Sequence, residues 1–139
     1  MSAKPKTGRV EPVAALLCDD VRREEGGILS LMGVAAPIIV FLEFPARKRI
    51  TPVLIFTGIE TGMAKVTVSL RWQDEVKWQV ETDLEIDERG TGSVIPLDPL
   101  VAGFEQPGVL WLEVETGGKQ YQLQNWRIEA QAPDYATPV

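Results

Sequence analysis

The stretch Lys65-Val-Thr-Val-Ser-Leu-Arg-Trp-Gln-Asp-Glu-Val-Lys-Trp-Gln-Val-Glu-Thr-Asp-Leu-Glu-Ile86 alternates polar and apolar residues. Every odd position from 65 to 85 is polar, and the even positions are apolar apart from Asp74 and Thr82. A repeat of two residues is the repeat of a β-strand, whose successive side chains point to opposite faces. The stretch therefore predicts two successive antiparallel strands, each with one face on a core and the other in water.

The turn between these two strands is constrained by the same alternation. Shorter loops set a polar residue opposite an apolar one, or place two like charges side by side, and both arrangements are unfavourable across a strand pair. We therefore expect a five-residue loop that ends at Lys77 and pairs Trp72 with Trp78.

A second hairpin is predicted around Gly117-Gly118, because two glycines supply the positive φ that a two-residue turn requires. This turn pairs Val114 with Tyr121 and Leu112 with Leu123. After Leu123 the apolar positions change from odd to even, which predicts a β-bulge near residues 124–125.

The chain outside the hairpins divides into a polar tail over 1–11, one domain over 12–131 and a C-terminal tail over 132–139. Further strands are expected at 13–18, 28–33, 38–44, 53–59 and 92–97, with 38–44 covered on both faces and Pro52 opening the next strand. Residues 13–21 also fit a helical stripe, although we favour a strand.

Many short strands, Gly/Pro turns and the lack of a long helical pattern predict an all-β fold. We expect an antiparallel β-sandwich of about eight or nine strands, immunoglobulin-like in general architecture. The segment 103–108 is similar to the corner that enters a late strand of such sandwiches, although it lacks the tyrosine found there.

Composition and charge exclude several classes of protein. The 139 residues carry a net charge of −6, and this acidic surface repels nucleic acids and anionic membranes. No apolar run approaches the ~20 residues of a membrane-spanning helix, and the basic N-terminus has no apolar run behind it. The single cysteine, Cys18, excludes an intrachain disulfide. We expect a cytoplasmic protein with no nucleic acid or membrane partner.

Two segments resemble the opening of a bacterial family of uncharacterised small β-rich proteins. The first is Leu16-Leu17-Cys18-Asp19, which has the form L-L-C-D. The second is Gly26-Gly27-Ile28-Leu29-Ser30-Leu31-Met32-Gly33, which has the form G-G-x-L-S-L-x-G. The resemblance is specific over roughly 13–45 and implies a small β-rich domain without implying an activity.

Residues for catalysis are scarce. The chain has no histidine, which excludes Ser-His-Asp and Cys-His nucleophilic sites and histidine metal centres. Cys18 lies in an apolar run, where a buried and inert thiol is typical. The basic run 47–49 is more typical of a solvated segment than of a phosphate site. We expect no enzyme and no cofactor.

Acidic residues in the predicted loops are the remaining candidates for ligand binding. They are Asp19-Asp20, Asp74-Glu75, Asp87-Glu88 and Asp98. If several of them met at one end of the sandwich, they could bind Ca²⁺, which takes six to eight oxygen ligands. The commoner explanation is that acidic residues concentrate in turns because turns are wet.

Two sets of residues are candidates for recognition. Asp19, Asp20, Arg22 and Arg23 form a loop of mixed charge, which is either a recognition loop or a solvated hairpin connection. Val109 and Trp111 lie opposite the apolar face of their strand, so they form either an exposed apolar spot or the second face of a strand covered on both sides. Trp72 and Trp78 are expected in the core.

We expect a non-catalytic β-sandwich that acts through protein contact, by self-assembly as a homo-oligomer or as an accessory subunit. The alternative is a module that binds a small ligand or Ca²⁺ at its acidic loops.

Overall fold

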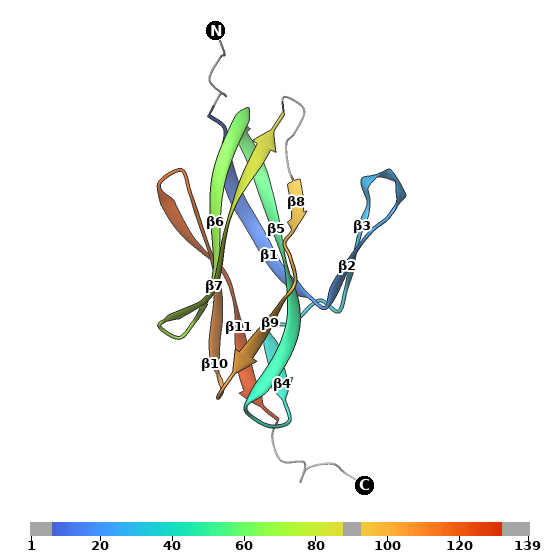
Figure 1. Cartoon of the computed structure of the whole chain (residues 1–139), viewed down its shortest axis with the longest axis vertical. Helices are drawn as coiled ribbons and strands as arrows, with labels where there is room; N and C mark the ends of the chain where they lie inside the picture. The colour runs from blue at the N-terminus through green and yellow to red at the C-terminus, as the bar shows by residue number, and fades with distance from the viewer. Residues whose placement is uncertain (1–6, 88–92, 132–139) are drawn as a thin grey trace.

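The computed structural model describes residues 7–87 and 93–131, which form two β-sheets packed face to face with a separate hairpin at one side (Figure 1). The described residues contain eleven strands and no α-helix. The predicted all-β sandwich is therefore confirmed, with more strands than the eight or nine expected. No helix in these two ranges is long and apolar enough to cross a membrane.

The four-stranded sheet is organised around one long strand, β5. It pairs with β1 along one edge, and with β9 and then β8 along the other. Pro52 lies inside β5 and does not open it, so this prediction was wrong. It sits where the partner changes from β9 to β8, and a missing N–H is tolerated there. The bounds of the strands are β1 Arg9–Cys18, β5 Ala46–Glu60, β8 Ser93–Pro96 and β9 Leu100–Phe104.

The five-stranded sheet has the order β4-β11-β10-β6-β7. Its neighbours are antiparallel except β4 and β11, which run parallel with Ile38 opposite Arg127. Ile38 and Val40 are exposed on one face of β4, so the prediction that this strand is covered on both faces was wrong. The bounds are β4 Ile38–Phe41, β6 Gly62–Trp72, β7 Glu75–Ile86, β10 Gly108–Thr116 and β11 Lys119–Ala130.

The hairpin of β6 and β7 forms where the alternation predicts it, but its turn differs from the expected one. Trp72 lies opposite Glu75 across a two-residue turn, in which Gln73 has φ 56°. An extra residue, Lys77, then forms a bulge that places Leu70 opposite Trp78. The bulge restores apolar pairing without a long loop, so the five-residue loop was wrong.

The hairpin of β10 and β11 matches the prediction closely. Its turn is Gly117-Gly118, and Val114 lies opposite Tyr121. The predicted bulge exists, one step earlier in the chain, because Leu112 lies opposite Gln124 and leaves Leu123 as the extra residue.

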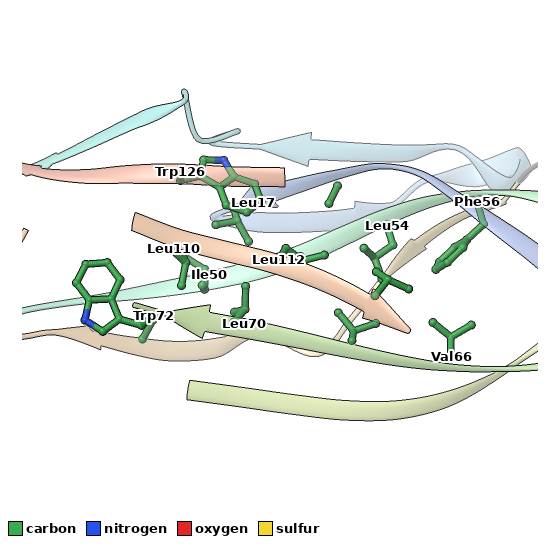
Figure 2. Packing of buried hydrophobic residues seen from close by; sticks show 14 of the residues in the cluster. Leu17, Ile50, Leu54, Phe56, Val66, Leu70, Trp72, Leu110, Leu112 and Trp126 are labelled. Carbon is green, nitrogen blue, oxygen red and sulfur yellow. The ribbon is translucent and has the colours of Figure 1, made fainter. Parts of the chain in front are cut away.

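The core fills the space between the two sheets (Figure 2). Residues 9–18 form a strand, not a helix, and β1 contributes Val10, Ala15 and Leu17 to the core. Trp72 is buried and packs edge-on against Phe104, with ring centroids 5.0 Å apart. Burial of these side chains is the main source of the fold's stability.

The ends of the domain are set by the first and last described strands in sequence. β1 begins at Arg9, ahead of the predicted domain start at residue 12. The predicted C-terminal tail, 132–139, lies outside the described residues.

The third element beside the two sheets is a two-stranded hairpin, which we call the arm. It extends away from the four-stranded sheet on the side opposite the five-stranded sheet (Figure 1). The arm consists of β2 Asp20–Arg23, the short 3₁₀ helix η1 Glu25–Gly27 and β3 Leu29–Met32.

Candidate functional site

The predicted recognition residues lie on two separate surfaces. Val109 and Trp111 belong to β10 in the five-stranded sheet, whereas Asp19, Asp20, Arg22 and Arg23 lie at the arm and its base. The sandwich separates the two sets (Figure 1).

Trp111 lies on the outward face of the five-stranded sheet, since its neighbours Leu110 and Leu112 point into the core. Its partners in the ladder are Arg71 of β6 and Asn125 of β11. Trp111 and Val109 are half-buried and line a shallow depression of about 530 Å³ at the β6–β7 turn. Trp111 therefore lies on the outward face of the sheet, and β10 is not fully covered on that face.

Further apolar side chains continue this outward face. Val76 lies opposite Arg71 on β7, and Ile38 lies beside Arg127 at the other edge of the sheet. Val40, on the same side of β4, is 52% exposed. We call Ile38, Val40, Val76, Val109 and Trp111 the outer patch. Its apolar residues are interleaved with polar and charged ones, as in many protein interfaces.

A buried carboxylate lies directly beside the outer patch. Glu113 follows Trp111 on the same face of β10 and is buried, although it belongs to the outward side of the sheet. Arg71 Nε donates to Glu113 Oε1 at 2.7 Å, and Gln122 Nε2 donates to Glu113 Oε2 at 3.2 Å. These bonds hold polar side chains of three neighbouring strands in place next to Trp111.

Arg71 and Glu113 are not recognisable as partners from the sequence alone. Their contact depends on the pairing of β6 with β10, two strands that are far apart in the chain. The sequence did place Glu113 on the same strand face as Trp111, and this was the available sign that Glu113 belongs to the site.

One face of the arm is mainly apolar but carries Arg23, and the other face is mixed. Val21 lies opposite Leu31 and Arg23 lies opposite Leu29, so these four side chains share a face. None of the described residues of the arm, 20–32, is buried.

Asp19 holds the base of the arm. Its carboxylate accepts a hydrogen bond from Lys48 Nζ at 2.8 Å, and its N–H donates to the Met32 carbonyl at 2.9 Å. Gly33 has φ 66°, and a side chain there would collide with the Asp19 carboxylate. Asp19 therefore positions the arm, and Arg22 pairs with Asp20 at 3.9 Å on the arm itself.

A cleft of about 240 Å³ separates the arm from the four-stranded sheet. Arg23 and Val21 line it from the arm, and Arg49 and Thr51 line it from β5. Asp98 lies on its rim after β8. Neither Arg23, Arg49 nor Asp98 forms an ion pair with any residue in 7–87 or 93–131.

The acidic pairs are distributed over the molecule. Asp20 and Asp98 line the cleft beside the arm, whereas Asp74 lines the depression at Trp111. In the part of the chain that the structure describes, no three His, Cys, Asp or Glu side chains are placed to hold a metal ion. Glu88 lies outside that part.

Cys18 is buried, as its apolar surroundings predicted. Burial raises the pKa of its thiol above the ordinary value of 9.0, and the neighbouring Asp19 carboxylate raises the pKa further. The thiol is therefore protonated and unreactive near neutral pH.

Comparison with known proteins places the chain in a family. The model of a family of unknown function, DUF6941, matches residues 13–129, which include the arm and the strands of both sheets apart from the first four residues of β1 and the last residue of β11. The chain belongs to this family. None of the curated proteins compared with the chain matches it. Membership of DUF6941 agrees with the predicted resemblance to a family of uncharacterised β-rich proteins. Because the function of DUF6941 is unknown, membership assigns no activity to the protein.

Proposed function

We propose that this DUF6941 protein is a non-catalytic β-sandwich domain that acts by binding another protein through the outer patch. One observation carries the proposal: the outward face of the five-stranded sheet carries the half-buried Trp111 together with the exposed apolar side chains of Ile38, Val40 and Val76. Apolar side chains interleaved with polar groups are typical of protein interfaces, and tryptophan and arginine dominate their binding energy.

The Arg71–Glu113 pair supports this role. It immobilises the polar rim beside Trp111 before any partner arrives, so little side-chain entropy is lost on binding there. A partner with an apolar centre and a hydrogen-bonding rim complements such a surface.

The remaining properties of the proposal follow from composition. The histidine-free sequence favours a domain without catalysis or cofactor. Its acidic charge disfavours nucleic acid and anionic membranes as partners, and its single cysteine favours the cytoplasm. We also propose that the family is bacterial and that the L-L-C-D and G-G-x-L-S-L-x-G segments are its signature.

The test compares partner capture by three variants in the cell of origin. Tagged wild-type protein, Trp111→Glu and Val76→Glu are each recovered natively, and their stoichiometric partners are identified by mass spectrometry. Val76 is exposed, so its substitution leaves the fold intact even if Trp111→Glu disturbs the sheet. Met63→Glu is the matched control, because Met63 is exposed on the outward face at the far end of β6.

We expect the partner to be lost from Trp111→Glu and Val76→Glu and retained by Met63→Glu. The same partners at the same stoichiometry in all four samples would show that the outer patch is not the binding surface. A Ca²⁺ or small-ligand module is the other candidate from the sequence, and the distributed acidic residues give it no specific support.

A further inference from the structure

The strand β7 forms a long open edge of the five-stranded sheet. It pairs with β6 on one side, and no strand in 7–87 or 93–131 pairs with it on the other. From Trp78 to Ile86 its ladder with β6 runs without a register shift, because the bulge at Lys77 lies nearer the turn. Alternate residues of this stretch turn their N–H and C=O groups away from β6, so a further strand can bind them.

The other outer strands of the two sheets lack such an edge. β4, β8 and β9 have only four or five residues each, and Pro96 ends β8. β1 is longer, but it contains Pro12 and its register with β5 shifts twice. Proteins blunt exposed strand edges by such means, because a long regular edge recruits further strands. The regular edge of β7 over 78–86 therefore indicates a surface that receives a strand.

The inward side chains of β7 are incompletely covered. Those between Trp78 and Ile86 are all half-buried, whereas the inward side chains of the neighbouring β6 from Ala64 onward are buried. Val80 is half-buried, for example, while Val68 directly opposite is 0% exposed. The four-stranded sheet therefore covers β6 fully and β7 only in part. A strand added to β7 would shield these apolar side chains from water.

A groove of about 410 Å³ opens between the end of β7 and the facing sheet. Its apolar lining comes from both sheets: Val10, Phe56, Leu84, Ile86 and Ile95. The groove takes the inward side chains of an added strand, while the backbone of that strand lies outside it along β7.

The outward side chains of the same stretch are acidic. Glu81, Asp83 and Glu85 are exposed and lie on one face of β7, and we call them the acidic row. Glu81 pairs with Lys65 of β6 at 3.0 Å, whereas Asp83 and Glu85 form no ion pair with any residue in 7–87 or 93–131. Opposite charges on neighbouring strands attract, so lysine or arginine at alternate positions of an added strand complements this row.

A second copy of β7 fits this edge poorly. Two copies of one strand pair antiparallel about a two-fold axis. An axis at Asp83 sets Glu81 opposite Glu85 of the other copy, and like charges directly opposite each other are destabilising. An axis at Val80 sets Asp83 beside Lys77, but there the bulge interrupts the ladder. The acidic row thus disfavours the protein's own edge and attracts a basic one.

We propose that β7 receives an extended segment of another protein as an added strand, and that this segment alternates basic with apolar residues. Its backbone pairs with β7 between Trp78 and Ile86, its basic side chains lie beside the acidic row, and its apolar side chains enter the groove. The inference goes beyond the proposed function, because it assigns a sheet edge that lies apart from the outer patch.

The first test measures binding of synthetic peptides to the full-length chain by fluorescence anisotropy. The probe is a labelled nine-residue peptide, the length of the stretch 78–86, in which lysine alternates with valine. We expect it to bind, and we expect no binding when glutamate replaces lysine or when serine replaces valine. Failure of the lysine–valine peptide, or equal binding of the serine peptide, would overturn the proposal.

Methylation of the peptide backbone tests strand pairing directly. Methyl groups on alternate nitrogens remove the N–H donors along one edge of the peptide. Only one edge pairs with β7, so one of the two methylated peptides should lose binding and the other should retain it. In hydrogen exchange, the bound lysine–valine peptide should slow exchange of β7 amides within 78–86 and leave β4 unchanged. Equal effects of the two methylations, or protection of β4 instead, would contradict strand addition to β7.

Charge reversal tests the acidic row. Asp83→Lys combined with Glu85→Lys should weaken binding of the lysine–valine peptide by about tenfold and should permit binding of the glutamate peptide. Glu24→Lys combined with Glu25→Lys is the control, because it changes the net charge equally at the exposed tip of the arm (Figure 1). Circular dichroism confirms that both variants keep their β-structure. Equal weakening by both pairs would show that binding follows net charge and not the edge.

The mass of the purified chain decides between a foreign segment and a second copy. We expect 15.4 kDa by light scattering without peptide. A dimer in which the β7 amides are already protected would assign the edge to a second copy. Trp111→Glu should retain peptide binding even though it loses the partner of the outer patch, so failure of one proposal is distinguishable from failure of the other.

Discussion

Arg71 and Glu113 form a 2.7 Å ion pair on the outward face of the five-stranded sheet, with side-chain exposures of 33% and 6%. The two residues are not directly opposite each other. Arg71 faces Trp111 in the ladder and reaches along it to Glu113, which faces Ser69. A carboxylate this deeply buried requires a partner, because its own desolvation is costly. The ion pair therefore stabilises the sheet and also fixes the side chains beside Trp111.

Replacing Glu113 with alanine should lower the free energy of unfolding by about 2–3 kcal/mol, because Arg71 and Gln122 lose their acceptor in a partly buried site. Urea denaturation measures the change. Glu115→Ala is the matched control, since Glu115 is exposed two residues along the same face, and its effect should stay within about 0.5 kcal/mol. Equal effects of the two substitutions would show that the pair contributes nothing beyond an ordinary surface contact.

Replacing Gly33 with alanine should release the base of the arm. The new Cβ meets the Asp19 carboxylate, and the positive φ of Gly33 is strained for any side chain, which together cost about 1–3 kcal/mol. Hydrogen exchange should show faster exchange of the Asp19 amide, whose bond to Met32 depends on this geometry. Gly103→Ala is the control, because among the described residues no atom beyond its two chain neighbours lies within 4 Å of a Cβ there. An unchanged Asp19 amide in Gly33→Ala would contradict this account.

The thiol of Cys18 should react slowly in the native protein. Because burial raises its pKa above 9.0, it holds its proton at pH 8, and iodoacetamide should modify it much more slowly than in urea. A folded-state pKa above the unfolded value means that the folded state binds the proton more tightly. The stability that this pKa difference contributes is fully present below the ordinary thiol pKa and is lost as the pH rises through the pKa of the folded state.

The dependence of stability on pH provides a second test of the Cys18 thiol. The free energy of unfolding of the wild type should decrease as the pH rises above about 9, and Cys18→Ala should lack that part of the decrease. Alkylation of the native protein at the rate of the unfolded chain would show that the thiol is accessible.

Millimolar Ca²⁺ should leave the melting temperature unchanged. The acidic side chains of the described residues do not gather into a site of three or more ligands, so the folded state offers Ca²⁺ no affinity that the unfolded chain lacks. A thermal melt with Ca²⁺, repeated with Mg²⁺ at equal ionic strength, provides the comparison. A rise with Ca²⁺ alone would restore the ligand-binding alternative.

The local pattern of the sequence predicted the hairpins well. Alternation over 65–86 and the Gly117-Gly118 turn are properties of neighbouring residues, and both hairpins form there. The β6–β7 turn was mispredicted because a bulge at Lys77 corrects the register in a way that alternation alone does not reveal. The strand β9 was missed because Leu100–Phe104 is short and is stabilised by pairing with β5, which is distant in the chain.

The candidate surfaces were predictable only in part. The position of Trp111 opposite the core face followed from alternation, and the mixed charge of Asp19, Asp20, Arg22 and Arg23 was visible directly. Their separation onto opposite sides of the sandwich depends on which sheet each strand joins, and no local pattern encodes that choice. For the same reason the sequence alone did not predict that Asp19 fixes the base of the arm, because its partner Lys48 lies in another strand.

The position of β11 determines when this protein can fold during its synthesis. Among the strands in 7–87 and 93–131, β11 comes last in sequence, yet it lies between β4 and β10 and supplies Trp126 and Ile128 to the core. Until residues up to Ala130 have left the ribosome, β4 has no neighbour and the sandwich remains open along its length. Such long-range closure makes folding slow, and it leaves the unfinished chain with exposed strand edges that chaperones recognise. The domain therefore folds as one unit only after Ala130 has been synthesised.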